Sequence, residues 1–143
     1  MEPASDRKRR AAILLVENDK TALDILCAVL ARKYPRVSIH CASDGKAGLA
    51  AALAHRPDIV ITDIHMPEMG GVQMVAQIRA AEPGTKLIVI TGESGRVESQ
   101  EWVGQGFEFD HYIVKPVGFQ ELFAAIDRCF EAISGQGGQG GML

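Results

Sequence analysis

Residues 58–71 read DIVITDIHMPEMGG, an apolar run that ends in an acid and is followed by a turn-forming segment. The run at 59–61 is short and continuous, which is typical of a parallel strand covered on both faces. Asp63 follows this run almost directly. The stretch therefore predicts a buried strand that presents an acid at its carboxyl end.

Similar apolar runs occur at 13–16, 87–90 and 112–114, and a weaker alternating run at 37–41 predicts an edge strand. The segments between them carry apolar residues at helical spacing: Leu23, Leu26 and Leu30; Leu49 and Leu53; Val72, Val75 and Ile78; and finally Leu122, Ile126, Cys129 and Ile133, with Phe123 and Phe130 beside them. Strand and helix thus alternate five times, which predicts a doubly wound α/β domain with a parallel sheet and helices on both faces. The fourth helix, between residues 92 and 109, is expected to be short or mobile.

Composition and charge limit the classes of function. The chain has 143 residues, 47% of them hydrophobic and 23% charged, which is the usage of one ordinary globular domain. A formal net charge of −3 provides no basic face for nucleic acid. No apolar run near the basic start of the chain is long enough for a signal peptide. We therefore expect a cytoplasmic protein with neither nucleic acid nor membrane as a partner.

The cysteines and the two ends of the chain complete this outline. Cys27, Cys41 and Cys129 are spaced too irregularly for a zinc motif, and an odd number suits a reducing compartment. We expect all three to be small buried hydrophobic residues. One domain is expected over residues 11–133, between a flexible basic N-terminus at 1–10 and a flexible Gly-rich tail at 134–143.

Polar residues follow the predicted strands at the points where the strands end: Glu17, Asn18 and Asp19, then Asp63, Thr91 and Lys115. Ligands of open α/β sheets bind beyond the carboxyl ends of the strands, so one edge collects acids, a hydroxyl and an amine. Crowded carboxylates favour a hard divalent cation, and Mg²⁺ suits an oxygen-lined site that also admits phosphate. A carboxylate beside Mg²⁺ can attack a phosphoryl group, whose oxygens Lys115 and Thr91 would bind.

The stretches LLVEND, DIVITDIHMPEMGG, LIVITG and YIVKP, in this order and spacing, resemble the receiver domain of two-component response regulators. The likeness covers residues 11–133. It implies a flavodoxin-like sheet with strand order 2-1-3-4-5. It also implies a signalling protein rather than an enzyme, one that takes part in its own phosphorylation and dephosphorylation.

The resemblance assigns roles to individual residues. Asp63 would be the phosphoacceptor, and Thr91 and Lys115 would hold the phosphoryl oxygens. The metal site for Mg²⁺ would consist of Glu17, Asn18, Asp63 and the backbone carbonyl of His65. Tyr112 stands where the family has its aromatic switch residue, which turns inward when the threonine moves, and the Lys115–Pro116 bond would be cis.

The resemblance also implies partners. A histidine kinase or a histidine phosphotransfer protein would supply the phosphoryl group, and an unknown downstream protein would read the surface formed by the fourth helix, the fifth strand and the last helix. The receiver would be a monomer or a phosphorylation-dependent dimer.

The chain departs from the family pattern at two places. The second acidic position of the metal site is Asn18, which removes one negative charge and should lower the affinity for Mg²⁺, and it is open whether Asp19 next to it compensates. The segment from Thr91 to Lys115 is slightly longer than usual, and residues 106–111 replace the small-residue motif that precedes the fifth strand. The first departure leaves open a pseudo-receiver that acts by protein contacts without phosphorylation.

A phosphohydrolase with an aspartyl nucleophile is a further alternative. Such an enzyme needs an acid two residues after the nucleophile, and His65 stands there instead. Taken singly, Asp63 could be a turn residue and Asn18 or Thr91 a helix N-cap. Four polar strand ends together favour the receiver.

Overall fold

The computed structural model describes residues 10–64, 66, 69–92 and 109–142, with side chains as far as residue 134. Its elements are β1 (Ala12–Val16), α2 (Lys20–Lys33), β2 (Ser38–Ala42), α3 (Gly45–His55), β3 (Ile59–Asp63), α4 (Gly71–Ala81), β4 (Lys86–Thr91), β5 (His111–Val114) and α6 (Phe119–Met142). The five strands form one sheet, all paired in parallel, in the order β2-β1-β3-β4-β5. The predicted doubly wound α/β fold and its strand order are therefore confirmed.

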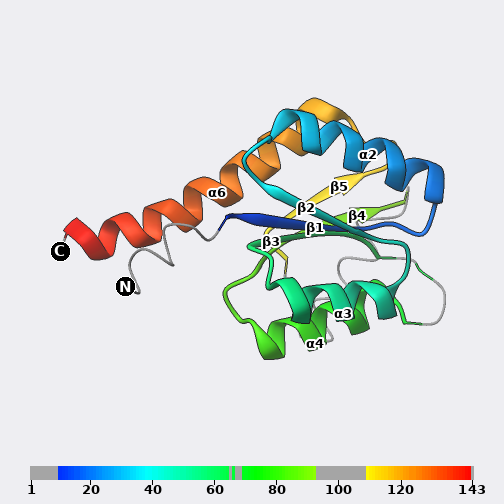
Figure 1. Cartoon of the computed structure of the whole chain (residues 1–143), viewed down its shortest axis with the longest axis horizontal. Helices are drawn as coiled ribbons and strands as arrows, with labels where there is room; N and C mark the ends of the chain where they lie inside the picture. Colours follow the sequence, from blue (N-terminus) through cyan, green and yellow to red (C-terminus); the bar gives the residue numbers. More distant parts are fainter. Residues whose placement is uncertain (1–9, 65, 67–68, 93–108, 143) are drawn as a thin grey trace.

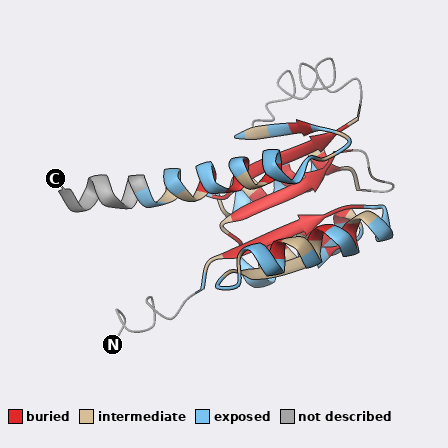
Figure 2. Ribbon diagram, turned by 90° about the horizontal axis from the view of Figure 1, so that it is seen from above, coloured by how far each residue is buried: buried red, intermediate tan, exposed pale blue. Residues whose placement is uncertain are grey.

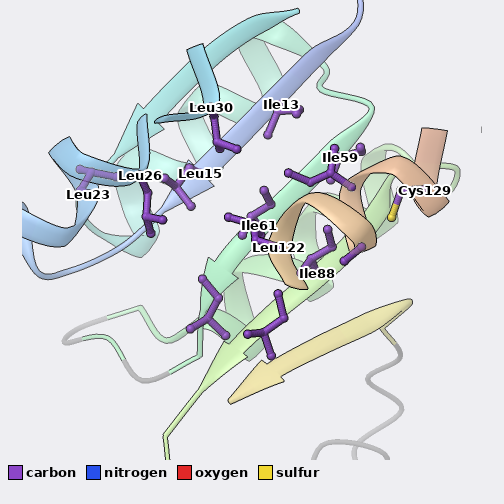
Figure 3. Packing of buried hydrophobic residues seen from close by; sticks show 14 residues of the cluster. Ile13, Leu15, Leu23, Leu26, Leu30, Ile59, Ile61, Ile88, Leu122 and Cys129 are labelled. Carbon is purple, nitrogen blue, oxygen red and sulfur yellow. The ribbon is translucent and has the colours of Figure 1, made fainter. Parts of the chain in front are cut away.

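Helices cover both faces of the sheet (Figure 1). Helices α2 and α6 pack on one face around a cluster that includes Leu26, Ile61 and Ile126, shown in part in Figure 3. Helices α3 and α4 pack on the other face, where Val60 and Met74 lie in a second cluster. Figure 2 shows that the central strands are buried along most of their length; by position, β1, β3 and β4 are almost entirely buried, whereas the edge strands β2 and β5 are mostly intermediate or exposed. Continuous apolar runs were the correct signal for β1, β3 and β4, because a parallel sheet with two covered faces offers no solvent side. The run at 112–114 was expected to be covered as well, but Tyr112 and Val114 on the edge strand β5 are 43% and 40% exposed.

The helix on residues 45–55 packs differently from the prediction. Leu53, expected on its buried face, is 52% exposed. The buried positions of α3 are Gly45, Gly48 and Ala52. A Cβ on Gly48 would lie 2.6 Å from the Met74 sulfur, so α3 approaches α4 through small residues. Leu49, the other predicted position, is partly buried against the second cluster.

The cysteine prediction is wrong for two of the three residues. Cys27 on α2 and Cys41 on β2 are joined by a disulfide, and Cys41 is exposed. Only Cys129 is a free, buried cysteine. The sequence could not show this pairing, because it depends on which faces of α2 and the edge strand meet.

The C-terminal end of the chain is helical where a flexible tail was expected. The backbone of α6 is helical to Met142, whereas a tail without regular structure was expected from residue 134; the helix meets no proline that would end it. The mobility expected for that tail stays a prediction. The fourth helix expected between residues 92 and 109, and the first nine residues of the N-terminus, lie outside the described part of the chain.

Candidate functional site

Three charged groups from three strand ends meet at the carboxyl edge of the sheet. Lys115 follows β5, and its Nζ lies 2.8 Å from Asp63 Oδ2 and 3.5 Å from Glu17 Oε1. Asp63 is the last residue of β3, and Glu17 follows β1, which pairs with β3. The strand order therefore brings together groups that are up to 98 positions apart in the sequence, counted from Glu17 to Lys115.

Both acids are largely withdrawn from solvent, whereas the amine is not. The side chains of Glu17 and Asp63 are 2% and 6% exposed, and that of Lys115 is 40% exposed. Burial, with the nearby charge of Asp63, raises the pKa of Glu17 above its ordinary value, although a hydrogen bond from the Asp19 N–H and the charge of Lys115 act in the opposite direction. Burial alone would lower the pKa of Lys115, but its bonds and charge interactions with Asp63 and Glu17 raise it.

Thr91 and Tyr112 lie on the neighbouring strands. Thr91 ends β4, is fully buried, and its backbone carbonyl accepts a hydrogen bond from the Lys115 N–H at 2.8 Å. Tyr112 on β5 is 43% exposed, and its ring meets that of Phe109 edge to face at 5.7 Å between centroids. The backbone of Thr91 thus lies beside that of Lys115, and the tyrosine ring lies outward.

The two polar residues after Glu17 are exposed and have different surroundings. Asp19 is the N-cap of α2, where its Oδ1 accepts a hydrogen bond from the Ala22 N–H at 3.2 Å. Asn18 is exposed next to the buried Glu17. Asp19 therefore caps α2, and Asn18 is exposed at the second position of the expected metal site.

The side chains at this edge of the sheet offer oxygen ligands of the kind that Mg²⁺ binds. No group of three His, Cys, Asp or Glu side chains suited to a metal occurs within the described ranges. Two carboxylates and an amide remain, and Mg²⁺ characteristically uses one or two protein carboxylates and keeps several waters. The burial and mutual charge that raise the pKa of Glu17 would be relieved by a cation, so Glu17, Asp63 and Asn18 fit this metal. His65, whose carbonyl was expected as a further ligand, lies outside the described residues.

Comparison with known proteins gives the family. The family model described as "Response regulator receiver domain" matches residues 13–127. The chain belongs to the response regulator receiver domain family. The motif-based prediction is thereby confirmed.

Individual relatives agree with this assignment. The response regulator ArlR of Staphylococcus haemolyticus (strain JCSC1435) is 32% identical over 114 residues, which cover 80% of this chain and 50% of ArlR. The probable transcriptional regulatory protein TcrX of Mycobacterium tuberculosis is 26% identical over 77% of this chain and 45% of its own length. This receiver thus spans half or less of the length of these two relatives.

Solved structures match over nearly their whole length. The signal receiver domain of an HD domain-containing protein from Pseudomonas fluorescens Pf-5 is 30% identical, with a TM-score of 0.76 over 87% of this chain and 97% of that one. A CheY-like receiver domain protein from Methanospirillum hungatei JF-1 gives a TM-score of 0.78 at 24% identity, over 89% and 98% of the two chains. The second likeness supports the fold alone.

Gly71 is a site residue of this receiver that the sequence analysis did not single out. A Cβ there would lie 2.6 Å from the Asp63 carbonyl oxygen and 2.8 Å from Ile64 Cα, and the Gly71 N–H donates to the Ile64 carbonyl at 3.0 Å. The first turn of α4 therefore packs directly on the backbone that carries Asp63. The paired glycines that end the stretch at 58–71 were the available signal.

A cavity of about 500 Å³ lies beside the charged cluster of the receiver. Glu17 and Lys115 line it together with Ile25, Leu26 and Val117. Ile25 is 51% exposed and contributes apolar surface to this wall. The apolar part of the wall comes from α2 and from the segment between β5 and α6, immediately next to the acids and the amine.

Proposed function

We propose that this receiver accepts a phosphoryl group on Asp63 from the phosphohistidine of a histidine kinase or a histidine phosphotransfer protein. The carrying observation is the convergence of Lys115 and Glu17 on Asp63, with distances of 2.8 Å and 3.5 Å from the amine to the two acids. In the transfer, a carboxylate oxygen of Asp63 bonds to phosphorus, the P–N bond of the donor breaks, and the electron pair returns to the imidazole.

The residues of the site have separable tasks in this proposal. Lys115 leaves its direct bond with Asp63 and binds the phosphoryl oxygens, and Thr91 donates its hydroxyl to another of them. Bound Mg²⁺, held by Glu17, Asn18 and Asp63, would neutralise charge on the phosphoryl group. The receiver catalyses no turnover of an external substrate and contributes only to its own phosphorylation and dephosphorylation.

The donor would dock on the apolar wall of the cavity. Ile25 and Val117 lie next to Lys115 and Glu17, so a protein that covers them brings its phosphohistidine to the amine. Exclusion of water from this region would strengthen the interactions of the acids and the amine with the incoming phosphate.

Output would follow from a population shift. A phosphoryl group on Asp63 recruits Thr91 and Lys115, which end β4 and follow β5, and thereby favours one of two arrangements of the surface formed by the segment between β4 and β5, by β5 and by α6. Tyr112 lies on β5 with its ring outward, so an inward turn on activation is available to it. A downstream protein of unknown identity would read the change, either on a monomer or through a phosphorylation-dependent dimer.

We place this protein in the cytoplasm, where histidine kinases present their phosphohistidine. Among the described residues, no helix is long and apolar enough to cross a membrane.

The test is chemical phosphorylation. With Mg²⁺ and acetyl phosphate, intact-mass spectrometry should detect one added phosphoryl group on the wild-type protein and none on Asp63→Asn. Asp58→Asn is a matched control, because Asp58 lies in the same stretch but bonds the Ala12 N–H at the opposite end of β1. Label that persists in Asp63→Asn and disappears in Asp58→Asn would contradict the assignment.

One observation favours the pseudo-receiver as second candidate. With Asn18 in place of an acid, Glu17 and Asp63 are the two acids paired with Lys115 in the described part of the chain, and a weakened metal site would leave Asp63 unphosphorylated. A wild-type protein that is inert to acetyl phosphate, and becomes labelled on Asn18→Asp, would establish this alternative.

A further inference from the structure

The disulfide between Cys27 and Cys41 connects two elements that flank the site. Cys27 lies on α2 and Cys41 on β2, with their Cα atoms 6.7 Å apart. β2 is an edge strand that pairs only with β1 in the sheet. The bond therefore fastens an edge strand to the helix above it (Figure 1).

The disulfide is close to the backbone of Glu17. Cys41 is paired in register with Leu15, and the carbonyl of the next residue, Ala42, accepts a hydrogen bond from the Glu17 N–H at 3.1 Å. On the other side, Leu26 precedes Cys27 and lines the cavity that Glu17 also lines. Both ends of the crosslink are thus one residue away from groups that position or surround Glu17.

The three cysteines differ in their access to solvent. Cys41 is exposed and Cys27 is partly buried, so a reagent in solution can reach the disulfide from the side of Cys41. Cys129 is 1% exposed, and burial raises the pKa of its thiol to about 11. Cys129 is therefore unreactive in the folded protein and serves as an internal reference.

We propose that Cys27 and Cys41 form a reversible thiol–disulfide modification site, exchanged by small thiols and disulfides, whose state controls how firmly α2 and β2 hold the backbone of Glu17. Disulfides of proteins from reducing compartments are usually of this transient, redox-sensing type. The proposal concerns the redox chemistry of the pair and does not require that Asp63 be phosphorylated.

The exchange is balanced with a dithiol as reductant. A thiolate of the dithiol attacks Cys41 Sγ, the bond to Cys27 breaks, and Cys27 Sγ leaves with the electron pair and takes a proton. The second thiolate of the reductant then releases Cys41, which takes a proton in turn. The protein gains two electrons and two protons per disulfide, and the dithiol becomes a disulfide.

Thiol labelling tests the exchange. The folded protein is equilibrated with oxidised glutathione or with dithiothreitol and treated with N-ethylmaleimide, and its mass is measured by intact-mass spectrometry. The oxidised form should take up no label and the reduced form two, with a third at Cys129 only in denaturant. Cys129→Ser should behave the same in the folded state, and Cys27→Ser should not form the crosslink.

Either of two results overturns the exchange: thiols of the folded protein that stay free in oxidised glutathione, or a disulfide that dithiothreitol does not reduce until the protein unfolds. Reduction should also lower Tm by roughly 6–12 °C, because the bond closes a loop between positions 14 residues apart.

Amide hydrogen exchange tests the link to the site. Reduction should accelerate exchange of the Glu17 N–H by about tenfold, since its acceptor lies on the released edge strand. The Ile64 N–H, which bonds the Ile90 carbonyl between β3 and β4, is the control and should not change. The double variant Cys27→Ser, Cys41→Ser should show the fast rate without reductant. Equal Glu17 exchange in both redox states would refute the link.

Discussion

Lys115 Nζ lies 2.8 Å from Asp63 Oδ2, so the amine of the residue that follows β5 donates a charged hydrogen bond to the carboxylate at the end of β3. The two residues are 52 positions apart, and strand β4 lies between their strands. In the proposed function, a phosphoryl group on Asp63 displaces this direct bond. Phosphorylation would then be coupled to the position of Lys115.

Replacing Lys115 with methionine should make the stability of the domain depend more strongly on Mg²⁺. The change leaves Asp63 and Glu17 buried without their amine, which we expect to cost about 1–2 kcal/mol; a fully buried pair would cost more, but Lys115 is 40% exposed. Added Mg²⁺ should restore part of the loss and raise Tm more in Lys115→Met than in the wild type, as measured by thermal unfolding with and without Mg²⁺. Lys20→Met is the control, because its pair with Asp24 is on the surface and should have almost no effect. An Mg²⁺ response no larger than that of the wild type would contradict the proposed metal site.

Glu17→Gln should stabilise the protein while it weakens metal binding. Burial raises the pKa of Glu17, so between its ordinary and its raised pKa the folded state holds more protons than the unfolded state, and stability falls as pH increases through that window. Glutamine removes the buried charge but can still accept the Asp19 N–H bond. At pH 7.5 we expect unfolding to require on the order of 1 kcal/mol more free energy, with the slope above pH 4.5 reduced and Mg²⁺ affinity about tenfold lower.

Urea unfolding across pH 4 to 8 and calorimetric Mg²⁺ titration provide these measurements. Glu82→Gln is a matched control: it removes an exposed carboxylate that pairs with Arg56 far from the site. A stability curve of Glu17→Gln parallel to that of the wild type would show that Glu17 is not the group responsible for the slope.

The sequence predicted the strands and the polar residues at their ends because both follow from local pattern. A parallel strand buried on two faces needs a continuous apolar run, and the residue that ends it must face the sheet edge. Asp63, Thr91 and Lys115 were found in this way. The direct contact of Lys115 with both acids agrees with the predicted pocket, although the roles of these residues stay predictions.

The features that the sequence did not predict depend on contacts between segments that are distant in the chain. Leu53 fits a helical stripe, yet the close approach of Gly48 to Met74 places α3 so that Leu53 is exposed. The pairing of Cys27 with Cys41 depends on how α2 lies over β2. Gly71 was not singled out from the sequence, because the need for its small size comes from the Asp63 backbone that it packs against.

Asn18→Asp should strengthen Mg²⁺ binding by about threefold to tenfold, because a carboxylate is a stronger ligand for this hard cation than an amide. Asp19→Asn is the control, since asparagine caps a helix as well as aspartate and α2 should remain intact. Calorimetric titration of both variants checks the prediction. A loss of affinity in Asp19→Asn, with no gain in Asn18→Asp, would identify Asp19 rather than position 18 as the second acidic ligand.

Gly71→Ala should damage both stability and the phosphoacceptor. The new Cβ would lie 2.6 Å from the Asp63 carbonyl oxygen and 2.8 Å from Ile64 Cα. Both are backbone atoms, which cannot relieve the contact by a change of rotamer. Shifting α4 or the end of β3 to relieve the contact should cost about 1–3 kcal/mol, the usual range for overpacking. The same shift should displace the Asp63 carboxylate from Lys115 and slow labelling by acetyl phosphate.

Gly84→Ala is the matched control, because nothing lies within 4 Å of the Cβ position there, and its stability should stay within about 0.5 kcal/mol of the wild type. Urea unfolding of both variants gives the first comparison and labelling rates the second; equal stabilities would mean that α4 does not fix the backbone under Asp63.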